Sequence, residues 1–506
     1  MTIQQNRDAE FCGKVPLHQT NLIQPHGVLL IVSKGDLKIL QISENIRTVL
    51  DKPAAEIVNT FLSNYILPEE ISMLQNRFAT PVEGKLPLTF TFSAHGVLKK
   101  FLTLVQVQPG YYIIEMESEP EEAADSFIKV YQELKFVIAA IEATTTIEEA
   151  ARLVVNELKR VSGFDKVMIY HFDAEWNGTV IAEALEPGMD MYLGLKFPAS
   201  DIPKQAREMY RRNPYRLIPD IDYQPVRLYP VLNPQTGAFT DLTDSNLRSV
   251  AGVHLEYLRN MNVKASMSTR IVKDGVLWGL ISCHHREAKY LSYQMCSLFE
   301  LLSNIISAKV TALEQKESYE FQSQMQVLYA KLVAYVYSNH TLATALEEQP
   351  HELLKLLGAE GVALVLNGHV QNIGTTPTTT EVEDLIFWLQ TNNIQQLYHT
   401  AQLPTAFEDA GHYAERASGL LALPVQPERG HYILAFRPEV VRQVSWGGNP
   451  SEAVTFEPDG KRYHPRHSFA VWREQVHQQA FPWTEAQLEI AEQFRNFVVD
   501  YTLRKM

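Results

Sequence analysis

The chain has 506 residues, of which 45% are hydrophobic and 21% charged, enough for about three globular domains with their own cores. A net charge of −14 without a long basic run argues against a nucleic-acid partner. Three cysteines cannot form a disulfide scaffold and favour the cytoplasm, and no signal peptide or apolar run long enough to cross a membrane is found.

Residues 1–22 are polar and contain Cys12, which is either an ordinary thiol in a tail or an accessible nucleophile awaiting an electrophile. Apolar runs and turn residues then predict a five-stranded sheet domain with short helices between Ile46 and Gln75. The expected strands are 27–32, 37–42, 86–92, 97–107 and 111–117. The acidic residues 119–125 are expected to form a linker.

A second domain begins with two predicted helices and continues with strands, a proline-rich span and a hairpin. The expected helices are 126–143, 147–162, 204–212 and most of 246–258, and the expected strands are 166–172, 178–184, 265–273 and 276–285. Asp274-Gly275 is a strong hairpin signal between the last two strands. The span 213–245 is expected to be irregular, and a loop of that length inside a compact domain is usually functional.

The stretch 197–203, Phe-Pro-Ala-Ser-Asp-Ile-Pro, has two interpretations. Pro203 fits the first position of the following helix, with Ser200 or Asp201 as its cap. Alternatively, the two prolines hold the Asp201 carboxylate rigidly among apolar groups, which is typical of a functional acid.

A long helix is expected over 292–338, with an apolar stripe that resembles a coiled-coil seam. Strands are expected at 361–366, 420–425 and 432–437, followed by Trp446-Gly447-Gly448, a polar excursion and Pro465-Arg466-His467-Ser468-Phe469. A final helix covers 485–504.

The whole chain resembles a bacteriophytochrome. The resemblance rests on 198–203, on His254 to Met261, on the strand 278–285 and on the two motifs around Trp446 and Arg466. It implies an α/β (α+β) fold of three domains, each an antiparallel sheet with flanking helices, joined by a long helical spine. The implied limits are an extension at 1–22, a PAS domain at 23–120, a GAF domain at 126–310, and a PHY domain at 311–506 with its tongue at about 442–478. A figure-of-eight knot is expected where the segment before the PAS domain crosses the GAF loop near Ile23.

A linear tetrapyrrole (bilin) is the cofactor that the resemblance implies. Such a ligand needs aromatic walls, cations for its propionates and polar groups for its nitrogens and carbonyls. Arg216 and Arg248 match the propionate clamps, His254 the imidazole near the inner rings, and His284 the donor to the terminal ring. The remaining matched residues are Ile23, Tyr170, Tyr192, Phe197, Asp201, Ile202, Pro203, Tyr210, Tyr257, Ser266 and Ser268.

The attachment site indicates which bilin. Plant and cyanobacterial types carry a cysteine in the GAF helix, where this chain has Val253. Cys12 matches the cysteine of biliverdin-binding members, so the resemblance implies biliverdin IXα in a thioether with Cys12. The family's common Ser-Pro is replaced by Ser249-Val250.

The implied function is red/far-red photoreception, relayed by a switch that involves Asp201, Arg466, Ser468 and Trp472. A homodimer through the GAF and spine helices is expected, with a histidine kinase or another effector as output, no catalytic residues, no metal, and no nucleic-acid or membrane partner. Two alternatives stay open at this point: an enzyme with a Cys12 nucleophile or a His/Asp pair, and a PAS–GAF sensor of a small metabolite or cyclic nucleotide.

Overall fold

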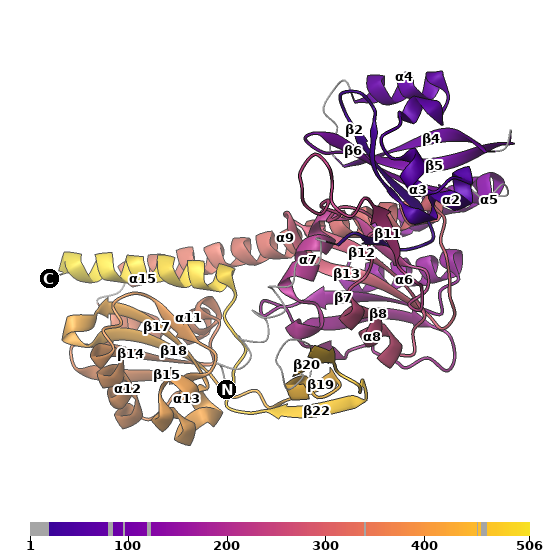
Figure 1. The fold of residues 1–506 in the computed structure, drawn as a ribbon. Helices are drawn as coiled ribbons and strands as arrows, with labels where there is room; N and C mark the ends of the chain where they lie inside the picture. Colours follow the sequence, from indigo (N-terminus) through magenta and orange to yellow (C-terminus); the bar gives the residue numbers. More distant parts are fainter. Residues whose placement is uncertain are drawn as a thin grey trace. The chain divides into compact units, whose positions relative to one another are not determined.

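The computed structural model describes residues 20–78, 84–94, 97–118, 123–338, 341–452, 454–456 and 463–505; Cys12 therefore lies outside the described residues. These residues form two compact units. One contains the residues up to Thr311 together with Ser445–Trp472, and the other contains Ala312–Val444 and the residues from Arg473 onward. The first unit carries two large sheets and the second carries one (Figure 1). The expected three-sheet α/β architecture is confirmed.

All five strands predicted for the first sheet are present. They are β2 (Val28–Ser33), β3 (Ile39–Ser43), β4 (Lys85–Ala94), β5 (Val97–Val107) and β6 (Tyr111–Ser118). The short helices α2 (Arg47–Leu50), α3 (Ala54–Ile57) and α4 (Pro68–Arg77) follow β3, as expected. Two further short strands, β1 (Leu22–Ile23) and β11 (Val226–Tyr229), extend this antiparallel sheet to the order β1-β11-β3-β2-β6-β5-β4.

The prediction that 213–245 is irregular was partly wrong, because this span contains β11 and β10 (Tyr215–Ile218). Both are strands only through pairing with distant partners, β11 with β1 and β3 and β10 with β12. The leading segment passes between two parts of this region: Leu228 N–H donates to the Asn21 carbonyl on one side, and Gln24 N–H to the Leu247 carbonyl on the other. This placement is the one that the predicted knot requires, while the knot itself stays a prediction.

The second sheet has the order β10-β12-β13-β7-β8-β9-β19-β22; its pairs from β10 to β9 are antiparallel, and β9 pairs with β19 in parallel. Its strands are β7 (Lys166–Phe172), β8 (Gly178–Leu185), β9 (Lys196–Phe197), β12 (Ala265–Lys273), β13 (Val276–His285), β19 (Arg442–Gly447) and β22 (Val471–Val476), in addition to β10. Asp274 and Gly275 both have positive φ, of 49° and 79°, so the predicted tight hairpin joins β12 to β13.

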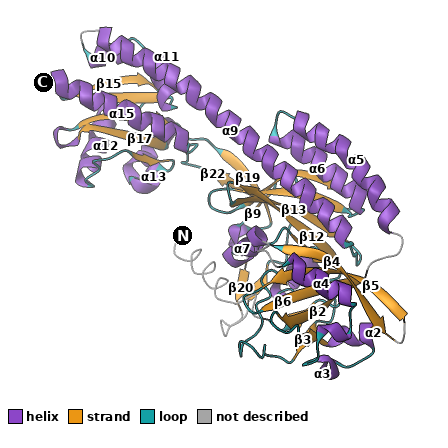
Figure 2. Ribbon diagram, turned by 90° about the horizontal axis from the view of Figure 1, so that it is seen from above, coloured by secondary structure: helices purple, strands orange, loops and turns teal. Residues whose placement is uncertain are grey.

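The two faces of this sheet have different neighbours. Figure 2 shows α5 (Ala123–Ala143), α6 (Ile147–Ser162) and the first part of α9 (Tyr293–Ser338) side by side on one face. Side chains such as Ile281 and Cys283 of β13 join the core there. The alternate residue Leu280 packs on the other face, with side chains of α8 (Gly252–Asn260), while α7 (Lys204–Arg212) also contacts β12 and β13. Successive side chains of β13 therefore lie alternately in the core beneath the helices and on the opposite face of the sheet, which also carries polar residues.

The apolar stripe of α9 contributes side chains to two hydrophobic cores of the chain. Leu298, Leu302, Ile306 and Val310 are buried in the first unit's helix-side core, whereas Met325 and Val336 belong to a core of the second unit. Among the described residues, α9 is the single helix that qualifies as a membrane span by length and composition. Part of the apolar stripe is therefore buried in these two cores, while the dimer contact expected along this helix stays a prediction.

The second unit contains an antiparallel sheet of order β15-β14-β18-β17-β16. Its strands are β14 (Gly361–Leu366), β15 (His369–Gly374), β16 (Tyr398–Thr400), β17 (Gly419–Gln426) and β18 (His431–Arg437). The helices are α10 (Leu342–Glu347), α11 (Pro350–Leu357), α12 (Thr379–Thr391), α13 (Leu403–Ala406), α14 (Ala414–Ala417) and α15 (Glu485–Lys505). The three predicted strands are confirmed, while the polar β15 and the short β16 lack the apolar runs that identify a strand in sequence.

Candidate ligand pocket

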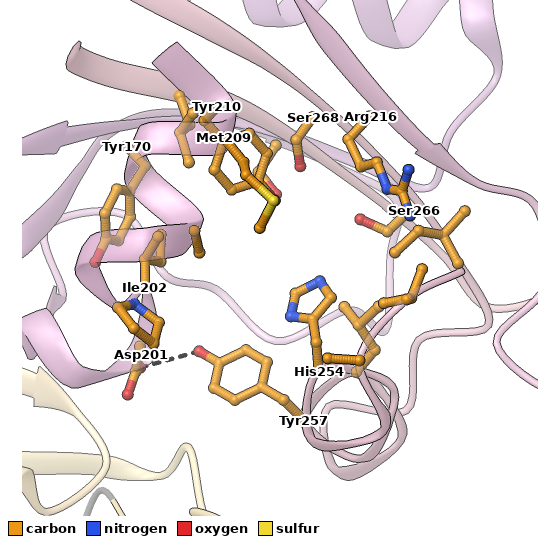
Figure 3. Close-up of a pocket in the computed structure, with 18 of the residues that line it drawn as sticks. Tyr170, Asp201, Ile202, Met209, Tyr210, Arg216, His254, Tyr257, Ser266 and Ser268 are labelled. Carbon is orange, nitrogen blue, oxygen red and sulfur yellow. Dashed lines mark hydrogen bonds between the residues drawn. The ribbon is translucent and has the colours of Figure 1, made fainter. Parts of the chain in front are cut away.

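One pocket lies on the face of the second sheet that is turned away from α5 and α6, and α7 and α8 contribute to its walls (Figure 3). Of the predicted binding residues that the structure describes, all except Ile23 line it. These are Tyr170, Tyr192, Phe197, Asp201, Ile202, Pro203, Tyr210, Arg216, Arg248, His254, Tyr257, Ser266, Ser268 and His284. The chain thus brings together residues from several separate parts of the sequence.

Strand register places the polar pocket residues in rows across the sheet. Ser268 of β12 is paired with Arg216 of β10 on one side and with Ser282 of β13 on the other. In the next row on the same face, Ser266 is paired with His284. Because side chains two residues apart in a strand share a face, the spacing 266/268 and 282/284 is what a polar wall requires.

The turn before α7 presents Asp201. The prediction that Ser200 or Asp201 caps α7 was wrong: α7 starts at Lys204, directly after Pro203, without a side-chain cap. The turn is instead held by Arg207, whose Nη1 donates to the Ile202 carbonyl at 2.7 Å. The Asp201 carboxylate is thereby left for tertiary contacts, which favours its interpretation as a functional acid.

Cations mark one part of the pocket. Arg216 donates from its Nη atoms to the backbone carbonyls of Ser245, Asn246 and Arg248, so it also supports the segment that carries Arg248. Burial lowers the pKa of both guanidinium groups, and burial together with the neighbouring Arg216 charge lowers that of Arg248 to about 9. A carboxylate bound here would offset that cost, and Tyr210, Ser266 and Ser268 add hydroxyl groups nearby.

Both pocket histidines are neutral at physiological pH. Burial and the Arg216 charge lower the pKa of His254 to about 4, and burial with the charges of Lys166 and His254 lowers that of His284 to about 3. His254 stacks with Tyr257 at a centroid distance of 6.3 Å, as their spacing of three on α8 predicted. The His284 Nε2 atom lies 3.4 Å from Ser282 Oγ. Each imidazole therefore offers one donor and one acceptor.

Asp201 is the centre of a buried polar contact. Its carboxylate accepts from Tyr257 Oη at 3.0 Å and from Arg466 Nη2 at 2.6 Å, and the two ionic side chains are 4% and 2% exposed. Burial raises the pKa of Asp201, and the Arg466 charge opposes that rise. The predicted pairing of Arg466 with Asp201 is thus present in this structure.

Arg466 belongs to the tongue, which we define as residues 442–478. Its strands β20 (Val454–Phe456) and β21 (Tyr463–Pro465) pair with each other, and Trp446 of β19 pairs with Lys196 of β9. Gly448 has φ of +97°, and a Cβ there would meet the Ser468 carbonyl oxygen at 2.3 Å, so glycine is required for this close approach.

Arg466 and Ser468 have different surroundings in this structure. Strand β21 ends at Pro465, and residues 466–470 are irregular. Arg466 is buried, whereas Ser468 and Trp472 are exposed. Phe469 packs on Tyr257 at a centroid distance of 5.1 Å. In this structure Arg466 alone of the predicted switch pair reaches Asp201.

Several pocket residues were not predicted. Ala206, Met209 and Asn213 line the pocket beside Pro203 and Tyr210, at spacings of three and four along α7. That periodicity was the signal that could have revealed them. Val253 also lines the pocket, as expected of the position that carries the cysteine in other members. Ile23 lies outside, buried in β1 and bridged to Arg248, and the described residues hold no cluster that could bind a metal.

Three family models match the chain: a PAS fold at 12–119, a GAF domain at 146–310 and a phytochrome region at 325–506. Cyanobacterial phytochrome B of Nostoc sp. is 37% identical over 507 residues, covering 100% of this chain and 68% of that protein. A bacteriophytochrome of Xanthomonas campestris pv. campestris is 32% identical over 500 residues, covering 96% and 78%. The chain spans about two thirds of the cyanobacterial relatives' length.

Solved structures agree with these matches over the whole chain. The bacteriophytochrome RpBphP3 from the photosynthetic bacterium R. palustris superposes with a TM-score of 0.85 at 34% identity, covering 98% of this chain and 99% of that one. The photosensory core module of the Stigmatella aurantiaca phytochrome gives 0.84 at 36% identity, covering 97% and 98%. Sequence and fold together show that the chain belongs to the phytochrome family and corresponds to the photosensory core of its bacteriophytochrome members.

Proposed function

We propose that the chain is a red/far-red photoreceptor that binds biliverdin IXα covalently and relays light absorption through its tongue. The observation that carries this proposal is the pairing of the pocket acid Asp201 with Arg466 of the tongue, at 2.6 Å and shielded from water. A change at the pocket wall beside Tyr257 and Asp201 acts directly on a contact that holds the tongue.

The polar groups of the pocket fit a bilin. Such a ligand has two propionates, four pyrrolic nitrogens and flat conjugated faces. Figure 3 shows Arg216, Ser266 and Ser268 in one region, His254 near the centre and Tyr170, Ile202 and Asp201 in another. The cations and hydroxyls would hold the propionates, His254 would face the inner nitrogens, and the tyrosines would enclose the terminal ring. When bound, biliverdin supplies absorption of red light and a photoisomerisable double bond.

Two of the three cysteines are poor candidates for attachment. Cys283 and Cys296 are buried in the helix-side core, and burial raises the pKa of both thiols. Neither lines the pocket. We therefore assign the attachment to Cys12, by addition of its S–H across a vinyl double bond of biliverdin, which forms one C–S bond and releases no leaving group.

On the protein side, the proposed switch consists of residues that exchange contacts with the Asp201 carboxylate. Loss of the Arg466 contact would leave Asp201 buried with Tyr257 as its remaining partner, and Ser468 is the replacement donor that the family resemblance suggests. Moving Ser468 into reach requires residues 466–470 to change conformation, which fits a bistable tongue. We further propose cytoplasmic location, a homodimer, and output through a histidine kinase or another effector.

Absorption spectroscopy of the protein mixed with biliverdin tests the function. We expect a red-absorbing band that red light converts into a far-red band and that far-red light restores. The Arg248→Ala variant, prepared in the same way, serves as the control for specific binding. It lacks one of the two guanidinium groups that are expected to bind the propionates. A spectrum equal to that of unbound biliverdin, unchanged by red light, would contradict the proposal.

A further inference from the structure

A buried ion pair lies behind one wall of the pocket. Lys166 Nζ of β7 is 3.3 Å from Glu183 Oε1 of β8, and each side chain is 1% exposed. The ammonium also lies 3.5 Å from the centroid of the Tyr192 ring and donates to the Asp190 carbonyl. Removing two charges from water is costly, so a pair at this depth must be compensated by its contacts.

Both members of the pair hold Tyr192. The Glu183 carboxylate accepts from the backbone N–H of Tyr192 at 3.0 Å and of Leu193 at 3.1 Å. The Lys166 ammonium covers the ring face of Tyr192, a cation–π contact. Tyr192 lines the pocket, whereas Lys166 and Glu183 do not. The pair therefore acts on the pocket through other residues.

Lys166 is also the cross-strand neighbour of His284. The register of β7 with β13 pairs these two residues directly, and His284 is paired with Ser266 on its other side. The titratable and charged groups that affect His284 are Lys166 of β7 and His254 of α8. Lys166 itself faces Glu183, Asp190 and His284. Opposite residues on neighbouring strands are close enough for their charges to interact.

We propose that the Lys166–Glu183 pair is a positioning device of the pocket, which fixes the Tyr192 ring and, together with burial, keeps His284 a neutral imidazole. A neutral His284 presents a single N–H to the ligand and retains an acceptor for Ser282, whereas an imidazolium would present two donors. The role toward a bilin rests on the proposed function. The effect on His284 does not, since it arises from burial and from the protein's own charges.

Three variants separate charge from structure. Lys166→Arg keeps a cation, Lys166→Met removes it and leaves Glu183 buried, and Lys166→Met/Glu183→Gln removes both charges. The ¹⁵N shifts of histidine-labelled protein are followed between pH 4.5 and 8, with and without biliverdin, and the His284 signal is assigned from its loss in His284→Gln. We expect wild type and Lys166→Arg to stay neutral throughout. In Lys166→Met, where the Glu183 charge stays unpaired, the pKa of His284 should rise from about 3 by roughly two units, into the measured range, and by less in the double variant.

In biliverdin-loaded protein, conversion by red light should become dependent on pH in Lys166→Met and stay independent of pH in Lys166→Arg. If Lys166→Met does not fold, the pKa of His284 is measured in the double variant, in which neither position carries a charge. An unchanged His284 titration in the folded variants would overturn the proposal. If wild type binds no biliverdin but His284 shifts as expected in the ligand-free protein, the photoreceptor function fails and this inference stands.

Discussion

Replacing Arg466 by Ala should release the tongue from the pocket. At 2.6 Å and an effective dielectric constant of about 20, the attraction between the Arg466 and Asp201 charges is roughly 6 kcal/mol before desolvation is subtracted. Removing one partner of such a buried pair typically costs about 3–5 kcal/mol, because the other charge stays buried. Even the lower value corresponds to an increase of more than about a hundredfold in the population of the released tongue.

Amide hydrogen exchange measures this opening. The reporter is the Gly448 amide, which donates to the Ala470 carbonyl at 3.0 Å and is protected while the tongue is closed. We expect Arg466→Ala to lose that protection, and His467→Ala to change it little because His467 is exposed. In the combined Asp201→Asn/Arg466→Ala variant part of the protection should return, since no unpaired charge is left.

The sign of the pH dependence provides a second check. Burial raises the pKa of Asp201, and loss of Arg466 removes the main opposing charge, so this pKa rises further. A carboxyl whose pKa is raised by folding stabilises the closed form below its unfolded pKa and loses that contribution as the pH increases through the folded pKa. Protection in Arg466→Ala should therefore increase toward acidic pH, after correction for intrinsic exchange. Equal protection of Gly448 in wild type and Arg466→Ala at all pH values would refute the reasoning.

Three further substitutions test the remaining assignments. Cys12→Ser should bind biliverdin under native conditions but release it on denaturation, and bilin still migrating with the denatured chain would exclude the thioether. Arg248→Ala should lose a charge-assisted contact of about 1.5–3 kcal/mol, seen as slower assembly or faster dark reversion, so unchanged rates would count against a propionate clamp. Asp201→Ala should bind biliverdin, stall before the far-red state and fluoresce more strongly; a complete photocycle in this variant would remove Asp201 from the conversion.

Local signals were sufficient to predict most elements. The helix α6 and the hairpin of β12 and β13 have the predicted bounds, because Gly163 and Asp274-Gly275 adopt the positive φ that ends a helix or turns a hairpin. By contrast, β10 and β11 are strands only because distant segments offer them a pairing edge. No local pattern reveals such a partner.

The candidate site likewise contains residues that the sequence could predict and residues whose role depends on distant partners. The resemblance identified His284 and Asp201, and the structure places both in one pocket. It could not indicate that Lys166, an ordinary polar residue at the start of a predicted strand, is buried beside His284, because strand register decides that neighbourhood. The surroundings of Arg466 likewise lie beyond any local signal, since its contact with Asp201 joins segments that are far apart in the chain.

Light-minus-dark infrared spectroscopy of the biliverdin-loaded protein tests most directly whether the pocket drives the tongue. We expect the amide band to show loss of strand and gain of helix in wild type, because the described tongue contains the strands β19, β20, β21 and β22, and the proposed exchange of Arg466 for another partner of Asp201 requires it to change conformation. A variant that lacks residues 449–464 should lose this difference while keeping its visible photoconversion. An identical amide difference in the two proteins would contradict the account.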